Sequence, residues 1–484
     1  MAYNVVTSDL DIIRQQSIKK IIRLYILDFN YARVAEISGN MLAMNVSIDS
    51  ESDLRRSCSI ELVVVDDSYN VAAGGRIWLD KYIQPYIGYE NIHTGEVQWY
   101  NQGIYLINAP SWQYDAETKV LSFAGLDLMS KLTGLRNGQL EGMTYSIPAG
   151  QNVRNVIIDT IKLAGFNNYI VSECRSKNGA IVPTPYDIEI SAGGTVYDIL
   201  SELRDIMPNY EIFFDVDGVF IYQPIPTGQN VPVKIDDTML KNVLLNESVD
   251  IDFETVKNYI EVYGQTYDPD YYSATTTYTG GVLNLTVSSL STTAASVPNG
   301  ILIGFTAPQD INGAINVKLN NLTSAMPLID QYGESTYNFV SGGYYVIQWN
   351  YTDAATSPYY YIGKQQISAI AKDDNPDSPF YISGSVGMIR EVLSGGEYDN
   401  IITDSLAQQQ ADYSLWQKTR LQDSIALSIT PVPWLDVNDI IGHKAVGASE
   451  AKKYIVKNIS TDYGQVDGMQ TITAITYYPL YPDI

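Results

Sequence analysis

The chain contains two stretches of similar residues, SIELVVVDDSYNVAAGGRIWLD at 59–80 and SIALSITPVPWLD at 424–436. Each begins with alternating apolar and polar residues, which is typical of a β-strand with one buried face. Each then reaches the tripeptide Trp-Leu-Asp, although the segments between differ in length. The recurrence of one pattern at distant places predicts an internal repeat.

The similarity continues beyond the two tripeptides. After the first come a strand pattern at Tyr105–Asn108, a turn and a second strand pattern at Val120–Phe123. After the second come Tyr454–Lys457, a turn and Thr471–Ala474, in the same order. We therefore predict that a β unit is duplicated within the chain. Three such chains would present six similar units around one axis, so that a trimer would match a six-fold tube.

The first β unit is expected at residues 1–146. It opens with a short helix signal that Ser8 is expected to cap, and a helix near Leu126–Leu135 is expected to close it. Its last two strands are joined by Asp115–Thr118, a hairpin turn type. The strand patterns are IIRLYILDF (21–29), MLAMNVSIDS (41–50), CSIELVVVD (58–66), GGRIWLDKYIQPYIGY (74–89), GIYLINAPSWQY (103–114) and KVLSFAGLD (119–127).

Residues 147–235 change character and predict a small α+β domain. Apolar residues recur at helical spacing from Val153 to Ala164, and Gly165 follows as a stop. Thr195 is expected to cap a second helix. The segment Asp215–Gly218 lies between two strand patterns, and we interpret it as a hairpin turn. A calcium loop would need further ligands and a closing Glu, which the following residues do not supply.

A composition shift at residues 268–362 predicts a separate all-β domain that is sandwich-like. Ser, Thr, Gly, Asn and Tyr dominate there, and short strand patterns alternate with turn clusters. Because strand patterns resume afterwards, we interpret this domain as an insertion. The second β unit is then expected at 236–267 and 363–484. The predicted fold class is mainly β with α+β: two tube-like antiparallel β-barrels, the α+β domain and the inserted domain.

Composition limits the classes of function. The formal net charge of −25 is incompatible with a grip on a phosphate backbone, which needs clustered Lys and Arg. Cys58 and Cys174 lie far apart, so a disulfide framework is not expected, and the chain is expected to fold in a reducing cytoplasm. No apolar run reaches the length of a membrane-spanning helix, and the first residues lack a signal peptide pattern.

No catalytic, metal or cofactor residue is predicted. With His93 and His443 as its two histidines, the chain is not expected to hold a multi-histidine metal site, and both are expected at the surface. The glycine pairs Gly280-Gly281 and Gly342-Gly343 are expected in turns, not in phosphate loops. We therefore predict a protein that is not an enzyme.

Aromatic residues in the insertion leave two interpretations open. Trp349, Tyr344, Tyr345, Tyr351 and Tyr359–Tyr361 would either pack in a core or present rings to a sugar or a partner. The helix predicted from Asp404 to Arg420 leaves a similar choice, because its Leu406, Tyr413 and Trp416 suit either the outside of a barrel or a subunit interface.

One long segment carries a family resemblance. Residues 373–441 read DDNPDSPFYISGSVGMIREVLSGGEYDNIITDSLAQQQADYSLWQKTRLQDSIALSITPVPWLDVNDII. This segment resembles the baseplate hub and tail-tip hub proteins of contractile and long-tailed phages and of related injection machines. The order of a β unit, an α+β domain and a second β unit is also similar to the layout of that family.

The resemblance implies a homotrimer at the distal end of a tail tube, in which two β-barrels per chain form a pseudo-hexameric ring. It implies a distal tube or adaptor ring on one side, a tip or spike protein on the other, and a tape-measure protein as a further candidate partner. DNA would pass through the lumen without specific binding. The implied location is the virion tail, at the baseplate or tail tip, after assembly in the bacterial host cytoplasm.

Two other functions remain as alternatives. A tail-associated adhesin would bind a host cell-surface glycan through the inserted domain. A tail-associated wall hydrolase would need a lytic motif, and none is recognisable in the chain.

Overall fold

The computed structural model describes most of the chain. The described residues are 5–15, 17–38, 41–64, 69, 71–114, 119–142, 144–176, 179–185, 187–207, 209–266, 271–290, 297, 300–320, 325–329, 335–350, 359–362, 366–401, 404–464 and 468–479. The chain divides into two compact units, Met1–Phe253 with Gln422–Ile484, and Glu254–Leu421.

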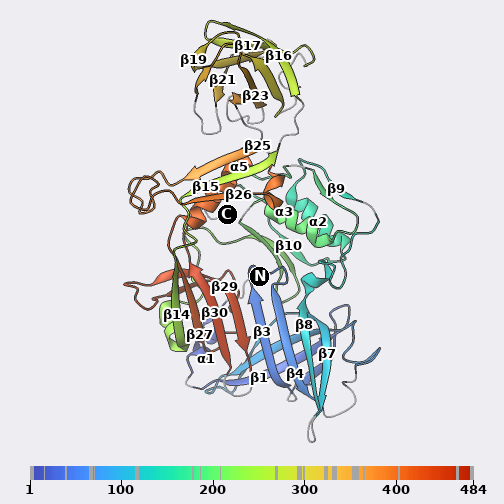
Figure 1. Cartoon of the computed structure of the whole chain (residues 1–484). Coiled ribbons are helices and arrows are strands. Elements are labelled where there is room, and N and C mark those ends of the chain that lie inside the picture. Colours follow the sequence, from blue (N-terminus) through green and yellow to red (C-terminus); the bar gives the residue numbers. More distant parts are fainter. Residues whose placement is uncertain are drawn as a thin grey trace. The chain divides into compact units, whose positions relative to one another are not determined.

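The first unit is built on a sheet of 13 strands, in the order β14-β27-β30-β29-β3-β4-β8-β7-β5-β1-β2, with β28 beside β29 and β6 beside β5. Figure 1 shows the red strands β27, β30 and β29 next to the blue strands β3 and β4. The strand bounds are β1 Lys19–Leu27, β2 Arg33–Ser38, β3 Met41–Asp49, β4 Arg56–Val63, β5 Tyr82–Glu90, β6 Val97–Asn101, β7 Tyr105–Tyr114, β8 Lys119–Asp127, β14 Leu244–Asp252, β27 Gln422–Ile429, β28 Ile440–His443, β29 Lys452–Asp462 and β30 Met469–Thr476.

The predicted duplication is present in the strand pairing. The order β3-β4-β8-β7-β5 recurs as β14-β27-β30-β29-β28. The registers also agree, because Tyr105 pairs with Asp127 as Tyr454 pairs with Thr476. A register shift near Met41 in β3 recurs near Leu244 in β14. The two units therefore correspond residue by residue.

This correspondence corrects one detail of the sequence comparison. Leu126 of β8 corresponds to Ile475 of β30, and these residues pair with Ser57 and Ser424 respectively. The residue that matches Ser424 is therefore Ser57, two positions before the Ser59 that the sequence suggested. A shift of two leaves every side chain on the same face of its strand, so the sequence pattern alone does not resolve it.

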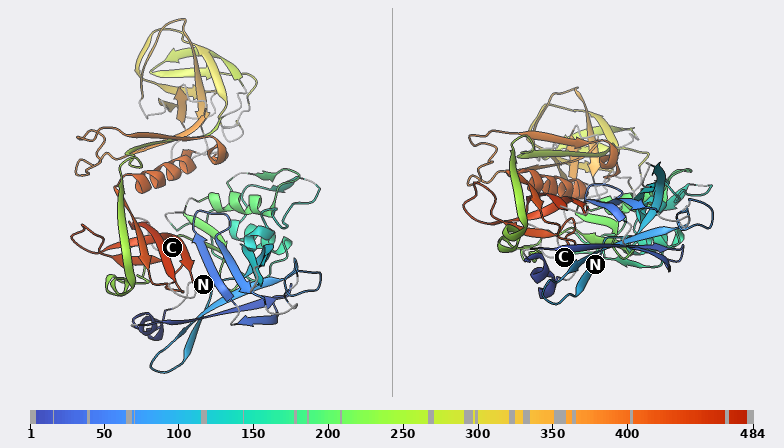
Figure 2. Two further views of the ribbon diagram at one scale, coloured as in Figure 1. Left: turned by 60° about the horizontal axis from the view of Figure 1, so that its bottom comes forward. Right: turned by 90° about the horizontal axis from the view of Figure 1, so that it is seen from below.

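The predicted fold class, mainly β with α+β, is confirmed. Its two β units, predicted as tube-like barrels, are joined in one antiparallel sheet and are not separate barrels. Strand β29 of the second β unit pairs antiparallel with β3 of the first β unit, with residues 458–462 opposite residues 49–45. An open sheet edge exposes unpaired peptide groups, and pairing two edges satisfies both. The units are therefore consecutive parts of one sheet, as the views of Figure 2 also show.

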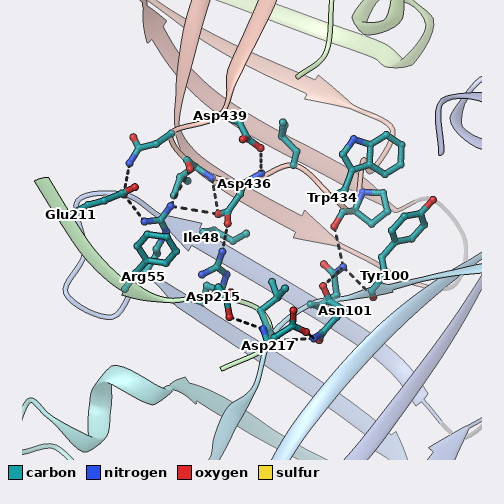
Figure 3. A pocket seen from close by; sticks show the side chains of 18 of the residues that line it. Ile48, Arg55, Tyr100, Asn101, Glu211, Asp215, Asp217, Trp434, Asp436 and Asp439 are labelled. Carbon is teal, nitrogen blue, oxygen red and sulfur yellow. Dashed lines mark hydrogen bonds and ion pairs between the residues drawn. The ribbon is translucent and has the colours of Figure 1, made fainter. Parts of the chain in front are cut away.

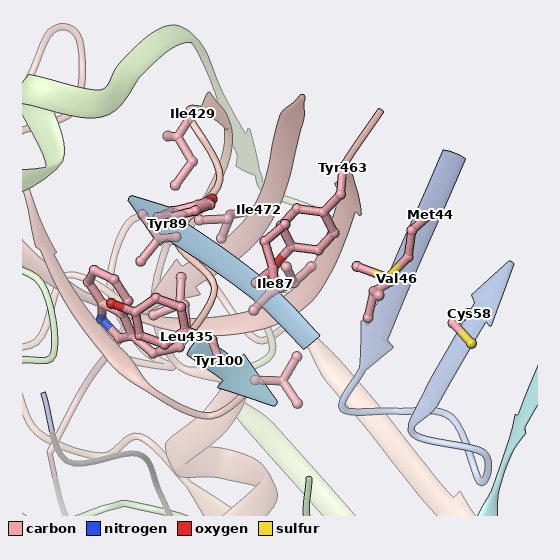
Figure 4. Packing of buried hydrophobic residues seen from close by; sticks show 14 of the residues in the cluster. Met44, Val46, Cys58, Ile87, Tyr89, Tyr100, Ile429, Leu435, Tyr463 and Ile472 are labelled. Atoms are coloured by element: carbon pink, nitrogen blue, oxygen red, sulfur yellow. The ribbon is translucent and has the colours of Figure 1, made fainter. Parts of the chain in front are cut away.

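Both β units contribute to one apolar core. Alternate residues of β4 are buried, as the sequence pattern predicts, and Ile60 is fully buried. Figure 4 shows Met44 and Val46 of the first β unit in the same cluster as Tyr463 and Ile472 of the second β unit. Burying an aliphatic side chain of this size contributes about 1.5–3 kcal/mol, so the shared core stabilises the joined arrangement.

The α+β domain has its own core and sheet. Helices α2 and α3 pack against each other and against a three-stranded sheet in the order β10-β13-β12. The bounds are η2 Leu128–Lys131, β9 Tyr145–Ile147, α2 Val153–Leu163, β10 Tyr169–Val171, β11 Ile188–Ile190, α3 Val196–Asp205, β12 Tyr210–Phe214 and β13 Phe220–Pro224. Helix α4 (Asp237–Val243) follows, and its buried residues belong to the core of the β units.

The helix ends test the predicted caps. Thr195 caps α3, because its side chain accepts the Asp198 N–H and the Asp198 carboxylate accepts the Thr195 N–H. The Ser8 cap is wrong: Ser8 lies inside helix α1 (Thr7–Ile13), and the Asp9 carboxylate accepts the N–H of Val6, which precedes the helix. The helix expected near Leu126–Leu135 is the short 3₁₀ helix η2.

The second unit contains a small sheet and a helix. Strand β15 lies between β25 and β26, and Ala407 and Ala411 of helix α5 are buried against this sheet, which settles the face that the helix covers. Residues 254–267 and 363–421, which the sequence assigned to the second β unit, belong to this unit. The bounds are β15 Tyr259–Thr266, β25 Gln366–Lys372, β26 Arg390–Ser394, η4 Gly396–Asn400 and α5 Asp404–Lys418.

The inserted domain is all-β, but it closes into a barrel where a sandwich-like arrangement was predicted. The barrel order is β16-β17-β20-β21-β24-β23-β18, and β19 pairs with β22. Closure follows because β16 pairs with both β17 and β18, which leaves no open edge. The bounds are β16 Tyr271–Thr279, β17 Val282–Thr286, β18 Leu302–Thr306, β19 Ile311–Ala314, β20 Asn316–Leu319, β21 Met326–Ile329, β22 Thr336–Phe339, β23 Tyr344–Asn350 and β24 Tyr359–Ile362.

Candidate functional site

A cavity of about 340 Å³ lies in the first unit, where three parts of the chain meet. Arg55 precedes β4 and Arg56 begins it, strand β12 supplies Glu211 and Phe213, and the loop before β28 supplies residues 433–439. The cavity therefore joins the first β unit, the α+β domain and the second β unit. Figure 3 shows Arg55 between Glu211 and Asp436.

Arg55 connects all three parts. Its Nη1 donates to Glu211 Oε2 at 2.7 Å, and its Nη2 donates to the Val437 carbonyl at 3.0 Å. The guanidinium carbon lies 3.7 Å from the centroid of the Phe213 ring. Asn438 also donates to Glu211 Oε2, at 2.6 Å. A buried carboxylate with several donors is well compensated for its lost hydration.

Arg56 makes the second set of contacts. Its Nη1 donates to the Phe214 carbonyl at 2.7 Å, and its Nη2 donates to the Asp436 carboxylate. Its backbone N–H donates to Asp127 Oδ2 at 3.1 Å, and Asp127 Oδ1 accepts the Met129 N–H at 2.8 Å. One arginine thus fixes the start of β4 to the end of β12 and to the second β unit.

The carboxylates around the arginines differ in pKa. Burial alone would raise the pKa of Asp436, but the charges of Arg56 and Arg55 outweigh it, and the pKa lies below its ordinary value. Burial raises the pKa of Asp439 to about 6, and the negative charge of Asp436 adds to the effect. Burial also raises the pKa of Asp127, against the hydrogen bond from Met129.

Gln102 extends these contacts along the sheet. Gln102 donates to the Pro433 carbonyl at 3.1 Å and accepts the Tyr463 hydroxyl at 2.9 Å. The Tyr105 hydroxyl donates to the Gln102 carbonyl at 2.6 Å. Tyr100 packs 5.5 Å from the Trp434 ring. These contacts hold the loop before β28 against the first β unit.

Chemically, this arrangement is a set of ion pairs and hydrogen bonds that the protein makes with itself. The guanidinium groups are bound to carboxylates and carbonyls, and the carboxylates are bound to N–H groups. Breaking one partner of such a network leaves a buried charge, which is strongly destabilising. The site therefore acts as a joint that fixes three parts of the first unit to one another.

Several residues near the joint were predicted from the sequence in other roles. Asp215 and Asp217 line the cavity, and the Asp215 carboxylate accepts the N–H groups of Asp217 and Val219, so the predicted hairpin turn is confirmed. Gly218 has a positive φ of 75°, which suits the turn. The turn predicted at Asp115–Thr118 lies outside the described residues, although β7 and β8 pair antiparallel on either side of it.

Of the two surface positions predicted for the histidines, one is confirmed and one is wrong. His93 is exposed in a turn, where its N–H donates to Asn91 Oδ1, as expected. The surface position predicted for His443 is wrong, because its ring is 1% exposed and its Nε2 lies 2.6 Å from Glu247 Oε2. A carboxylate at hydrogen-bond distance makes burial of an imidazole possible.

The cysteines, the glycine pairs and the described aromatic residues of the barrel do not line the cavity. Cys58 and Cys174 are free and buried, and burial raises the pKa of the Cys174 thiol to about 11. Gly280-Gly281 and Gly342 have positive φ angles in turns. In the barrel, Trp349 is fully buried and Tyr344 is 56% exposed, while Tyr351 lies outside the described residues.

The central residues of the joint were missed from the sequence. Arg55 and Arg56 stand next to each other just before an alternating strand, and Glu211 stands among aromatic residues of a strand pattern. Charged residues beside buried strands are the signal that was available. Their pairing was not predictable, because 156 positions separate Arg55 from Glu211.

Comparison with known proteins gives a fold relationship. Residues 377–481 match a family described as a domain of unknown function, DUF5048. No curated protein is significantly similar to the chain. Among the described residues, no helix is both long and apolar enough to span a bilayer.

Two solved structures resemble the whole chain. The 43 kDa tail protein of prophage MuSo2 from Shewanella oneidensis is 9% identical, with a TM-score of 0.51 over 96% of this chain and 100% of that one. A tail protein from Neisseria meningitidis is 9% identical, with a TM-score of 0.51 over 96% and 99%. The chain therefore has the fold of these tail proteins, and the predicted resemblance to phage tail proteins is confirmed for the fold.

Proposed function

We propose that the protein is a structural, non-enzymatic component of a phage tail tip or baseplate, a hub of which three copies form a ring. The observation that carries the proposal is the duplicated five-stranded unit. Two equivalent units per chain give a trimer six similar units around its axis, which matches the symmetry of a six-fold tube. The shared fold with two tail proteins supports the location in the virion tail.

The proposed ring joins a tail tube or adaptor ring on one side to a tip or spike protein on the other, and DNA passes through its lumen. The net charge of −25 supports passage without adhesion, because a surface of the same sign as the phosphates does not bind them. The buried joint supports this role as well, since a channel wall built from two β units needs them fixed to each other.

The test is the mass and symmetry of the purified full-length chain. We expect light scattering to give three times the chain mass of 53.8 kDa and electron-microscopy averages to show a ring with six similar lobes and a channel. An elongated trimer without a channel would contradict the ring and favour an adhesin. A chain that stays monomeric at all concentrations, also when mixed with tube subunits, would contradict it too.

A further inference from the structure

The segments that precede β5 and β28 correspond by strand register, because Tyr82 pairs with Leu106 as Ile440 pairs with Ile455, so Leu79 stands at the position of Val437. Val437 is 3% exposed and lies in the joint with the first β unit. Leu79 is 64% exposed. A large aliphatic side chain that is buried in one repeat and exposed in the other indicates a contact that the single chain does not supply.

The internal joint shows the geometry of such a contact. Strand β29 pairs with β3, residues 458–462 opposite 49–45. The Tyr463 N–H donates to the Met44 carbonyl at 2.8 Å, so every second peptide group of β3 from Met44 onward faces β29. The paired side chains Thr461 and Val46 are both 3% exposed.

The strands that correspond to this pair each have a free side. Strand β14 corresponds to β3 and ends the strand order of the sheet. Strand β7 corresponds to β29, and on the side away from β8 it pairs with β5 only at Tyr105 and Leu106. Within the described parts of the chain, no strand pairs with the rest of β7 on that side or with the outer side of β14.

The matching registers carry the internal pairing over to these two edges. Trp112 of β7 corresponds to Thr461, and Val249 of β14 corresponds to Val46, so Trp112 comes opposite Val249. Trp112 is 44% exposed, and Ile251 beside it on the same face is 52% exposed. Their counterparts in the internal joint, Thr461 and Ile48, are buried and half-buried respectively, so the side chains at the free edges are more exposed.

We propose that β7 of one copy of the chain pairs antiparallel with β14 of a second copy, in the register that sets Trp112 opposite Val249. The Trp78–Asp80 segment docks on that second copy as the corresponding residues 436–438 dock within the chain. This interface rests on the proposed ring and gives it a strand register. Because it joins two different surfaces, it repeats from copy to copy and closes when the rotation allows.

Two differences make the junction between copies weaker than the joint within a chain. Gln422 and Asp423 stand at the positions of Arg55 and Arg56, so the buried arginine contacts have no counterpart. Pro110 has no N–H and removes one hydrogen bond from the new ladder. The copies therefore fold singly and join afterwards.

Cross-linking tests the register directly. Ser111 and Asp250 come directly opposite each other at a position without ladder hydrogen bonds, where cysteines are within disulfide reach. We expect a mixture of the single variants Ser111→Cys and Asp250→Cys to give a cross-linked dimer on mild oxidation. The matched control mixes Ser111→Cys with Asp252→Cys, one step along the same face, and gives little product.

Leu79→Asp tests the docking segment. We expect it to abolish assembly and leave the melting temperature of the single chain unchanged, whereas Leu163→Asp, in a leucine that is 62% exposed on α2, leaves assembly intact. If the cysteine variants assemble into a ring but Ser111→Cys and Asp250→Cys do not cross-link, or if the ring still forms with Leu79→Asp, the proposed interface is wrong, while the proposed ring is not contradicted. A chain that never assembles overturns both.

Discussion

At the scale of single residues, the joint depends on charges from distant parts of the chain. Arg56 reaches Asp436, 380 positions away, and Arg55 reaches Glu211. Ion pairs at this degree of burial add little net stability when compared with apolar substitutes, but losing one partner is costly because the other charge stays buried. We predict that these pairs favour the one arrangement of the β units and the α+β domain that keeps all partners together.

We predict that Arg56→Met destabilises the first unit by about 3–5 kcal/mol, since it leaves the Asp436 charge with Arg55 at 3.8 Å as its nearest cation. The double variant Arg56→Met with Asp436→Leu should recover most of that loss. Denaturant unfolding measures both. Lys19→Met, which removes the exposed pair with Glu90, serves as the control and should cost about 1 kcal/mol or less. Equal losses in the single and double variants would contradict the pairing.

Asp439 gives a prediction for pH. Burial raises its folded-state pKa to about 6, so the folded protein holds this proton more tightly than the unfolded chain does. Its contribution is favourable at low pH and is lost as pH rises from about 4 through about 6. Asp439→Asn should therefore stabilise the protein at pH 7–8 by roughly 1–3 kcal/mol and have little effect at pH 4.

The measurement for this variant is the unfolding midpoint in denaturant across the pH range. Asp377→Asn, at an exposed position of the second unit, is the matched control and should change nothing. A stabilisation of Asp439→Asn that is independent of pH would show that packing, and not the carboxyl proton, is responsible.

At the scale of elements, the two β units share their pairing and differ in their side chains. Gly125 of β8 corresponds to Ala474 of β30. A Cβ at Gly125 would meet Cys58 Sγ and lie 2.7 Å from the Tyr105 Cβ. Ala474 is fully buried, so the second β unit accommodates at this position the methyl group that the first β unit excludes. The two β units thus have the same strand pairing, but their buried side chains pack differently.

We expect Gly125→Ala to destabilise the first unit by about 1–3 kcal/mol, because the added methyl group overpacks the contact between β4, β7 and β8. Thermal unfolding would detect it as a lower melting temperature. Gly442→Ala, where the nearest atom lies 3.5 Å away, is the control at a glycine of the second β unit. Unchanged stability of Gly125→Ala would mean that β8 shifts freely, against the register described above.

At the scale of the whole molecule, the inserted barrel is a self-contained body. Its core residues all come from 283–349. Thr266 at the end of β15 pairs with Gln366 at the start of β25, so the barrel is carried in the connection of one hairpin. A domain with its own core, joined through two neighbouring chain positions, folds independently of its host.

We predict that replacing residues 267–365 with an Asn-Gly turn leaves the rest of the chain folded and able to assemble. The isolated barrel, residues 271–362, should show a cooperative melting transition of its own. Circular dichroism and light scattering measure the two outcomes. Loss of assembly in the shortened chain would assign the barrel a role in the ring, and binding of cell-wall polysaccharide by the isolated barrel would support the adhesin.

The sequence by itself determined the local structure and the duplication. Alternation of apolar residues marked most strands of the sheet, Thr195 marked the start of α3, and Asp215–Gly218 marked a turn. These features depend on contacts between residues close in the chain, so a single sequence reveals them. The repeat was visible because both copies obey the same alternation.

Only the tertiary structure decided how the parts join. The pairing of β29 with β3 turned two expected barrels into one sheet, and it brought Arg55 to Glu211 and Arg56 to Asp436. The physical reason is that a strand edge accepts any partner of compatible register, so the choice depends on burial and charge over the whole assembly. Those terms are summed over residues hundreds of positions apart, and no local pattern records them.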